Sequence, residues 1–150
     1  ALVIEPGGRA GGRTTLAHPA YPGLRVWPDV LRVSENAAVV PFVADYTEKR
    51  RVALAAGRFV TGPCRLRRLY LLEPDEAPSP RIARLSKRAA VMAILTHSYV
   101  LDACDAGRLS EQLMTACAVL DVADVRTLSF PRDLDRLAEV RGALRTDLAT

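Results

Sequence analysis

With 150 residues, of which 49% are hydrophobic and 25% charged, the chain has the size and composition of one globular domain with a substantial core. No apolar run is long enough for a membrane-spanning helix, and no signal peptide is recognisable. A formal net charge of +4 permits an anionic partner, such as a nucleotide, a nucleic acid or an acidic protein.

The cysteines and histidines argue against a metal site built from protein ligands alone. Cys64, Cys104 and Cys117 are odd in number and lack the spacing of metal ligands. His18 and His97 lie far apart in the sequence. All three cysteines are therefore expected to be reduced, in a cytoplasmic protein. Cys104 and Cys117, in predicted helices, are expected to pack as small apolar side chains.

The chain begins with an apolar run over residues 1–5, which predicts a buried strand. It starts in this run without a methionine, so we interpret the sequence as a fragment that lacks upstream strands. A turn rich in glycine and arginine follows at residues 6–13, and two threonines come next.

This turn fits the phosphate-binding pattern G-x-x-x-x-G-K-[ST] at every fixed position but one. Gly7, Gly12 and Thr14 are in place, and Arg13 occupies the lysine position. Glycines let successive backbone N–H groups face phosphate oxygens, and a threonine here ligates Mg²⁺. Arginine keeps the positive charge but is a wide planar fork rather than a slim ammonium group. The predicted nucleotide-binding residues are Gly7, Gly8, Gly11, Gly12, Arg13, Thr14 and Thr15, and the alternative is a flexible turn without a ligand.

A phosphate-binding loop normally leads into a helix of several turns. Here Pro19 and Pro22 follow closely, and proline interrupts helical hydrogen bonding. We therefore expect at most one helical turn, from Thr14 to Ala17.

The middle of the chain predicts short strands. Residues 24–27 resemble one strand, and residues 30–33 and 38–42 resemble a hairpin. Residues 66–72 form the most apolar strand candidate. We expect this strand to be central and buried, flanked by the strands near residues 1–5 and 125–130.

The last part of the chain predicts helices around one more strand. Ser86 is a candidate N-cap for a helix to about Ala106, and Ser110 for a second helix. Pro131 opens a final helix after the strand at 125–130. Helical spacing assigns these side chains to the core: Val91, Ile94, Leu95 and Tyr99 in the first helix, and Leu113, Met114, Cys117 and Leu120 in the second.

Several segments together resemble the compact relatives of the HPr serine kinase/phosphorylase family. They are the glycine loop, Val26-Trp27-Pro28-Asp29-Val30-Leu31, Val39-Val40-Pro41-Phe42, Leu69-Tyr70-Leu71-Leu72-Glu73-Pro74, the stretch from Arg84 through Tyr99, and Phe130-Pro131-Arg132-Asp133-Leu134. The resemblance implies one α/β domain over residues 1–150, with a P-loop, a mixed sheet and C-terminal helices, akin to phosphoenolpyruvate carboxykinase. It also suggests a homo-oligomer.

The resemblance carries over to the loop at Gly7, Gly12, Arg13 and Thr14. Asp29 matches the second of two paired aspartates, and Pro28 stands where the first would be. In the family these acids orient Mg²⁺ and take a proton from the attacking hydroxyl. The resemblance thus implies Thr14 and Asp29 as metal ligands and Asp29 as the catalytic base, whereas the structural alternative for Asp29 is an ordinary turn aspartate.

Three functional hypotheses remain. The first is phosphotransfer from ATP or GTP, with Mg²⁺, to a serine or another hydroxyl acceptor on a protein or small molecule. The second is a degenerate relative that senses nucleotide or binds a protein partner without turnover. It is favoured by Arg13, by Pro28 and by the prolines after the loop. The third, a basic nucleic-acid binder, lacks a docking motif, and aromatic residues are only 5% of the chain.

Overall fold

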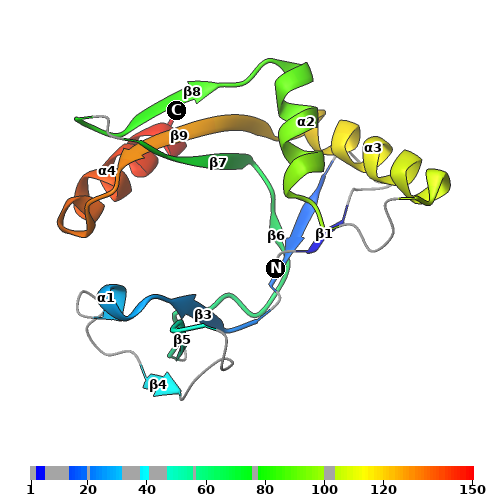
Figure 1. Ribbon diagram of the computed structural model, residues 1–150. Coiled ribbons are helices and arrows are strands. Elements are labelled where there is room, and N and C mark those ends of the chain that lie inside the picture. Colours follow the sequence, from blue (N-terminus) through cyan, green and yellow to red (C-terminus); the bar gives the residue numbers. More distant parts are fainter. Residues whose placement is uncertain are drawn as a thin grey trace. The chain divides into compact units, whose positions relative to one another are not determined.

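The computed structural model describes residues 3–5, 14–19, 21–31, 38–40, 47–55, 57–75, 78–99 and 104–150. It is a mixed α/β structure (Figure 1). Its contacts group the chain into two compact units, where the sequence analysis treats it as one domain. Unit 1 comprises Ala1–Val3 and Ala17–Cys64, and unit 2 comprises Ile4–Leu16 and Arg65–Thr150.

One three-stranded sheet consists of very short strands. Its strands are β1 (Val3–Glu5), β2 (Leu16–His18) and β6 (Cys64–Arg65), in the order β1-β2-β6. Next to it, Leu66 N donates a hydrogen bond to Thr15 O at 2.8 Å. This bond joins two parts of unit 2 that are far apart in sequence.

Unit 1 holds a small antiparallel sheet in the order β3-β5-β4, made of β3 (Gly23–Val26), β5 (Arg50–Ala53) and β4 (Ala38–Val40). The predicted hairpin between residues 30–33 and 38–42 is wrong. Pro28–Leu31 form the short helix α1, and β4 pairs with β5 instead. Proline at the first helical position explains the difference, because its fixed φ suits the start of a helix.

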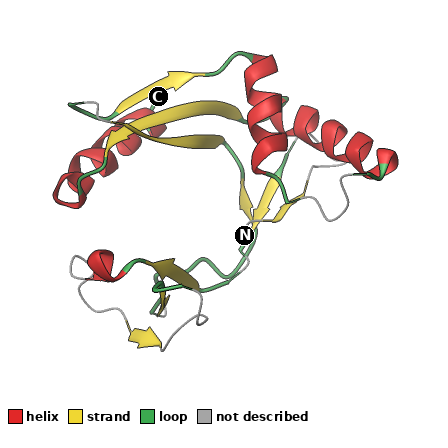
Figure 2. Cartoon of the chain, in the orientation of Figure 1, coloured by secondary structure: helices red, strands yellow, loops and turns green. Residues whose placement is uncertain are grey.

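Unit 2 contains a mixed sheet with helices (Figure 2). Strand β9 (Asp124–Pro131) runs parallel to β7 (Arg68–Asp75) and antiparallel to β8 (Arg81–Arg84). Helices α2 (Lys87–His97) and α3 (Ala106–Leu120) connect β8 to β9. The short 3₁₀ helix η1 (Leu134–Arg136) and α4 (Leu137–Leu148) follow β9.

The central strand of this sheet is β9, so the prediction that residues 66–72 are central is wrong. In the order β7-β9-β8, β7 lies at an edge, and Leu72 is 61% exposed. Val125 and Leu128 of β9 are buried instead. Apolar density indicates a strand but not its place in the sheet, and the expected neighbour near residues 1–5 belongs to another sheet.

The helix caps agree with the sequence in part. Ser86 caps α2 as predicted, accepting a hydrogen bond from Ala89 N at 3.3 Å. However, α2 ends at His97, and Asp105 rather than Ser110 caps α3 by accepting from Arg108 N at 3.1 Å. In the part of the chain that the structure describes, no helix has the length and apolarity needed to cross a membrane.

Candidate functional site

The glycine loop connects β1 to β2, which are neighbours in one sheet. Gly7, Gly8, Gly11, Gly12 and Arg13 themselves lie outside the described residues. Their assignment to nucleotide binding therefore stays a prediction, and the described evidence concerns the residues that follow the loop.

Those residues enter a strand and form no helical turn, which agrees with the expectation of at most one turn from Thr14 to Ala17. Strand β2 starts at Leu16, directly after the two threonines. Thr15 is only 2% exposed, and its carbonyl oxygen accepts from Leu66 N. The β-branched threonines favour an extended backbone, and Pro19 blocks a longer helix. Thr15 is thus buried beside the unit 2 backbone, whereas Thr14 is half-buried.

Asp29 lies in the first turn of α1. Its Oδ1 accepts a hydrogen bond from the backbone N–H of Val30 at 3.0 Å, in an exposed position. This is the geometry of a carboxylate that satisfies a helix N-terminus. Thr14 belongs to unit 2 and Asp29 to unit 1, so the Mg²⁺ site predicted to join them stays a prediction.

Unit 2 contains a charged cluster that the sequence analysis missed, which we call the Asp147 cluster: Arg68, Tyr70, Arg126 and Asp147. Arg68 Nη1 and the Tyr70 hydroxyl donate to Asp147 Oδ2, at 3.0 and 2.5 Å. Arg126 Nη1 donates to Asp147 Oδ1. The cluster is largely shielded from solvent, since the side chains of Arg68 and Asp147 are 13% and 11% exposed. It fastens α4 to β7 and β9.

A second carboxylate, that of Asp124, also accepts hydrogen bonds from arginines of this sheet. Arg126 Nη2 donates to Asp124 Oδ2 at 3.1 Å, and Arg84 Nη2 donates to the same oxygen at 2.8 Å. Arg126 is buried, and its Nε has no hydrogen-bond partner among the described residues. Three arginines therefore share two aspartates on this sheet.

These contacts lower the pKa of both carboxyl groups. The hydrogen bond from Tyr70 is the main cause of the low pKa of Asp147, and the charges of Arg126 and Arg68 add to it against the opposing effect of burial. The hydrogen bond from Arg126 likewise holds the pKa of Asp124 below its usual range. Burial, and then the bond to Asp147, raise the pKa of Tyr70. A carboxylate held this firmly in its charged form is a poor general base, so we interpret the cluster as structural.

Signals for this cluster were present in the sequence. Arg68 and Arg126 stand inside two strand candidates that are mostly hydrophobic, and a buried guanidinium needs a carboxylate partner. No spacing rule connects these arginines with Asp147, because Asp147 lies in α4, 79 residues after Arg68 and 21 residues after Arg126.

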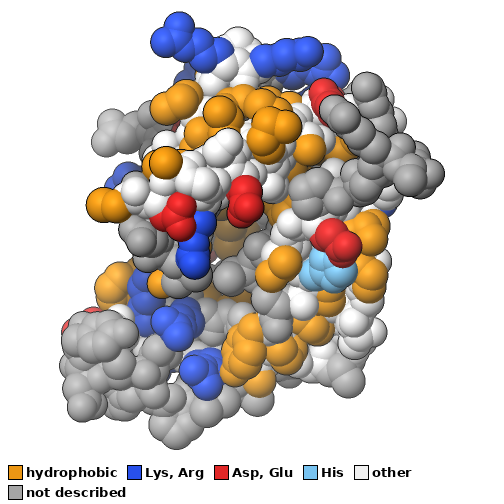
Figure 3. Space-filling view, turned by 90° about the vertical axis from the view of Figure 1, so that its right-hand side faces the viewer, with side chains coloured by type: hydrophobic (Ala, Val, Ile, Leu, Met, Phe, Trp, Pro, Cys, Tyr) orange, Lys and Arg blue, Asp and Glu red, His pale blue; other side chains and the backbone are white. Residues whose placement is uncertain are grey.

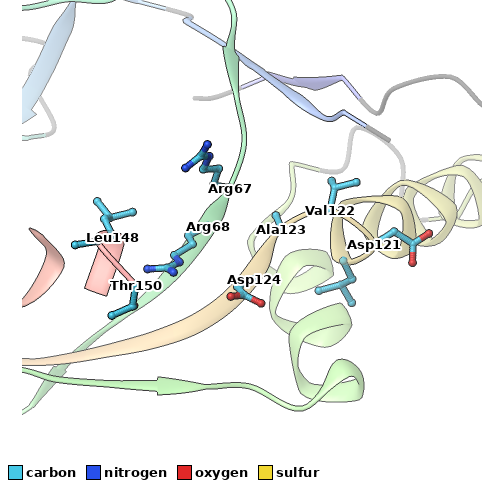
Figure 4. Close-up of a pocket in the computed structure, with 10 residues that line it drawn as sticks. Arg67, Arg68, Asp121, Val122, Ala123, Asp124, Leu148 and Thr150 are labelled. Carbon is cyan, nitrogen blue, oxygen red and sulfur yellow. The ribbon is translucent and has the colours of Figure 1, made fainter. Parts of the chain in front are cut away.

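A polar pocket of about 460 Å³ lies beside the cluster (Figure 4). Residues from three places in unit 2 line this pocket. They are Arg67 and Arg68, just before and at the start of β7, Leu120 through Asp124, between the end of α3 and the start of β9, and Leu148, Ala149 and Thr150. In Figure 4 the Arg68 side chain points toward Leu148 and Thr150. Among the residues that line the pocket, the two arginines are equalled in number by Asp121 and Asp124, and α3 and α4 end there with the negative ends of their dipoles. The lining therefore has no excess charge that would select an anion or a cation.

Within the described ranges, no group of three or more His, Cys, Asp or Glu residues is placed to hold a metal ion.

Comparison with protein-family models, with curated proteins and with solved structures finds no match for this chain.

Proposed function

We propose that the glycine loop binds a nucleotide phosphate without transferring it, so that the protein is a non-catalytic relative of the HPr kinase-like enzymes. The observation that carries this choice is the path of the chain after the loop. The two threonines lead into β2, and Thr15 is buried.

That path separates binding from catalysis. In a phosphotransferase the hydroxyl residues stand at a helix N-terminus, whose dipole stabilises the phosphate charge and whose threonine holds Mg²⁺. A strand provides no such dipole, because strand dipoles alternate. Backbone N–H groups of a glycine loop can still surround a phosphate, and Arg13 supplies positive charge. Binding of a phosphate therefore requires fewer of the features of HPr kinase-like enzymes than transfer of a phosphate requires.

The ligands that fit this proposal are ATP or GTP with Mg²⁺, and the proposed output is an interaction with a protein partner or a second copy. A cytoplasmic location, where nucleotide is abundant, suits this role. Cys104 and Cys117 are exposed, so the prediction that they pack as small apolar side chains is wrong. Exposed thiols such as those of Cys64 and Cys117 are compatible with a reducing compartment.

Replacing Gly12 with valine is expected to abolish nucleotide binding at the glycine loop while the far-UV circular dichroism stays unchanged. A side chain at this position prevents the close approach of backbone to phosphate. Titration calorimetry with ATP, with and without Mg²⁺, measures the affinity.

The matched control is Gly62→Val. A Cβ added at Gly62 meets nothing within 4 Å, so the same side chain is accommodated there. Equal ATP affinity in wild type and Gly12→Val would show that the loop is not the binding site.

Replacing Arg13 with lysine is expected to leave ATP hydrolysis and phosphotransfer at background. The lysine restores a slim ammonium group at the phosphates, but Pro28 and β2 remain. A rise of at least tenfold in turnover, about 1.4 kcal/mol of activation free energy, would mean that position 13 alone disables a catalytic site. Robust turnover by the unmodified chain would contradict the proposal directly.

A further inference from the structure

Two arginines lie directly opposite each other in the sheet of unit 1. In the antiparallel register of β3 and β5, Arg25 pairs with Arg51. Opposite residues in such a ladder have Cβ atoms about 4.5–5.5 Å apart, and like charges in these positions repel each other. The pair is therefore unfavourable unless something neutralises it.

The protein does not supply that neutralisation in the part of the chain that is described. Neither arginine forms an ion pair with a described aspartate or glutamate, in contrast to the arginines of the Asp147 cluster. Instead, Arg51 lies over an aromatic ring, with its Cζ 5.5 Å from the centre of Tyr21.

Both arginines line a hollow of about 570 Å³ in unit 1, together with Tyr21, Gly23 and Leu24. No described aspartate or glutamate lines it. Lys49 adds positive charge to the same unit, with its Nζ 5.1 Å from the ring centre of Trp27. Figure 3 shows several Lys and Arg side chains close together on the face in view. The hollow thus combines two arginines, which no described carboxylate pairs with, and an exposed aromatic ring.

Gly23 allows the Tyr21 ring to line this hollow. A Cβ on Gly23 would lie 2.5 Å from Tyr21 Cε1, which no real contact tolerates, and 3.2 Å from Val52 O. The backbone N–H of Gly23 also donates to Tyr21 O at 2.8 Å. A glycine at the start of β3 thus gives the ring a defined place beside Arg51.

We propose that this hollow binds a phosphate group, held between Arg25 and Arg51. Guanidinium groups bind phosphate through paired, charge-assisted hydrogen bonds, and one dianion would neutralise both arginines. The ring of Tyr21 keeps the Arg51 guanidinium in place and offers a surface to a base attached to that phosphate. This phosphate site lies in unit 1 and contains no residue of the glycine loop. It therefore does not depend on the nucleotide site proposed at the glycine loop.

Trp27 is the only tryptophan in the chain and follows β3 directly, so its fluorescence reports on this sheet. Titration with pyrophosphate is expected to give a saturable fluorescence change that weakens as salt is added. Arg25→Ala and Arg51→Ala should each weaken pyrophosphate binding at least tenfold. Arg51→Lys keeps the charge but loses the fork, so we expect it to fall between wild type and Arg51→Ala.

The matched control is Arg58→Ala, which removes an exposed arginine of unit 1 outside the hollow. It should change the affinity less than twofold. In the absence of pyrophosphate, Arg25→Ala should unfold at a slightly higher temperature than wild type, because it relieves the repulsion. If Arg25 had a purely structural role, Arg25→Ala would unfold at a lower temperature than wild type.

A Gly12→Val background distinguishes this site from the glycine loop. There, pyrophosphate binding should persist and should still depend on Arg25. ATP that binds this background more tightly than pyrophosphate would identify a nucleotide as the source of the phosphate, and equal affinities would identify a free phosphate group. A dissociation constant above about 10 mM, or an equal loss in Arg58→Ala, would overturn the proposal.

Discussion

Replacing Asp147 with asparagine is expected to lower the melting temperature by more than about 5 °C. The substitution keeps the shape of the side chain but removes the carboxylate that Arg68 and Arg126 share. Both guanidinium groups would then lie in a largely shielded position without their counter-charge. The amide would also present N–H donors where Asp147 now accepts three hydrogen bonds. Thermal unfolding followed by circular dichroism measures the change.

The matched control is Asp135→Asn in η1, where the carboxylate is exposed and the melting temperature should shift by less than about 1 °C. The pH dependence gives a second test. Because the folded pKa of Asp147 lies below its ordinary value of 3.8, the unfolded chain binds more protons between the two values. The stability due to this carboxylate is complete above the ordinary pKa and is lost as the pH falls through the folded pKa. Asp147→Asn should therefore lose less stability on acidification than wild type, and parallel acid profiles would contradict this role.

Replacing Leu128 with alanine is expected to cost about 2–5 kcal/mol of unfolding free energy. Leu128 lies on the central strand β9, is 2% exposed, and is among the largest fully buried side chains described. Its partners in the register of β7 and β8 are Leu72 and Ile82, so truncation leaves a cavity on the face of the sheet to which Leu128 points. Urea unfolding with an unchanged m-value measures the loss.

Leu113→Ala provides the comparison, because Leu113 lies in α3 of the same unit but is 45% exposed. We expect a change below about 1 kcal/mol, since alanine is also the better helix former. Equal costs at the two positions would mean that β9 is not the core of unit 2.

The sequence predicted where the strands and helices of unit 2 lie in the chain better than it predicted which strands pair with one another. Apolar runs predicted strands at 66–72 and 125–130, and the structure has β7 and β9 there. The mixed α/β architecture with helices near the C-terminus is also confirmed. Strand order, however, depends on pairing between distant residues. Local apolar density therefore could not show that β9, and not β7, is central.

Helical spacing identified α3 but chose the wrong inward face. Leu113, Met114 and Cys117 are exposed, whereas Ala116 and Val119 are buried. Small side chains let a helix lie close to its neighbours, so size alone misleads. Tyr99, assigned to the core, follows the end of α2 and is 85% exposed.

For the candidate site, the sequence predicted a phosphate-binding loop but not the structure of the residues that follow it. Thr14 and Thr15 fit a phosphate-binding pattern, yet the pattern does not specify whether a helix or a strand follows. The pairing of Arg25 with Arg51 was equally invisible, because it is set by the register of two strands separated by α1 and β4.

The order in which the chain visits its two units also constrains how it folds. Unit 2 is interrupted in sequence by the segment from Ala17 to Cys64, and the hydrogen bond from Leu66 N to Thr15 O closes the interruption. That segment therefore acts as an inserted module whose two ends meet at one place, the arrangement that tolerates domain insertion and circular permutation. Closing a flexible loop costs only about 0.6 kcal/mol more for each doubling of its length. The loop-closure cost to unit 2 therefore depends only weakly on the length of the inserted module, provided that the bond between Thr15 and Leu66 is kept.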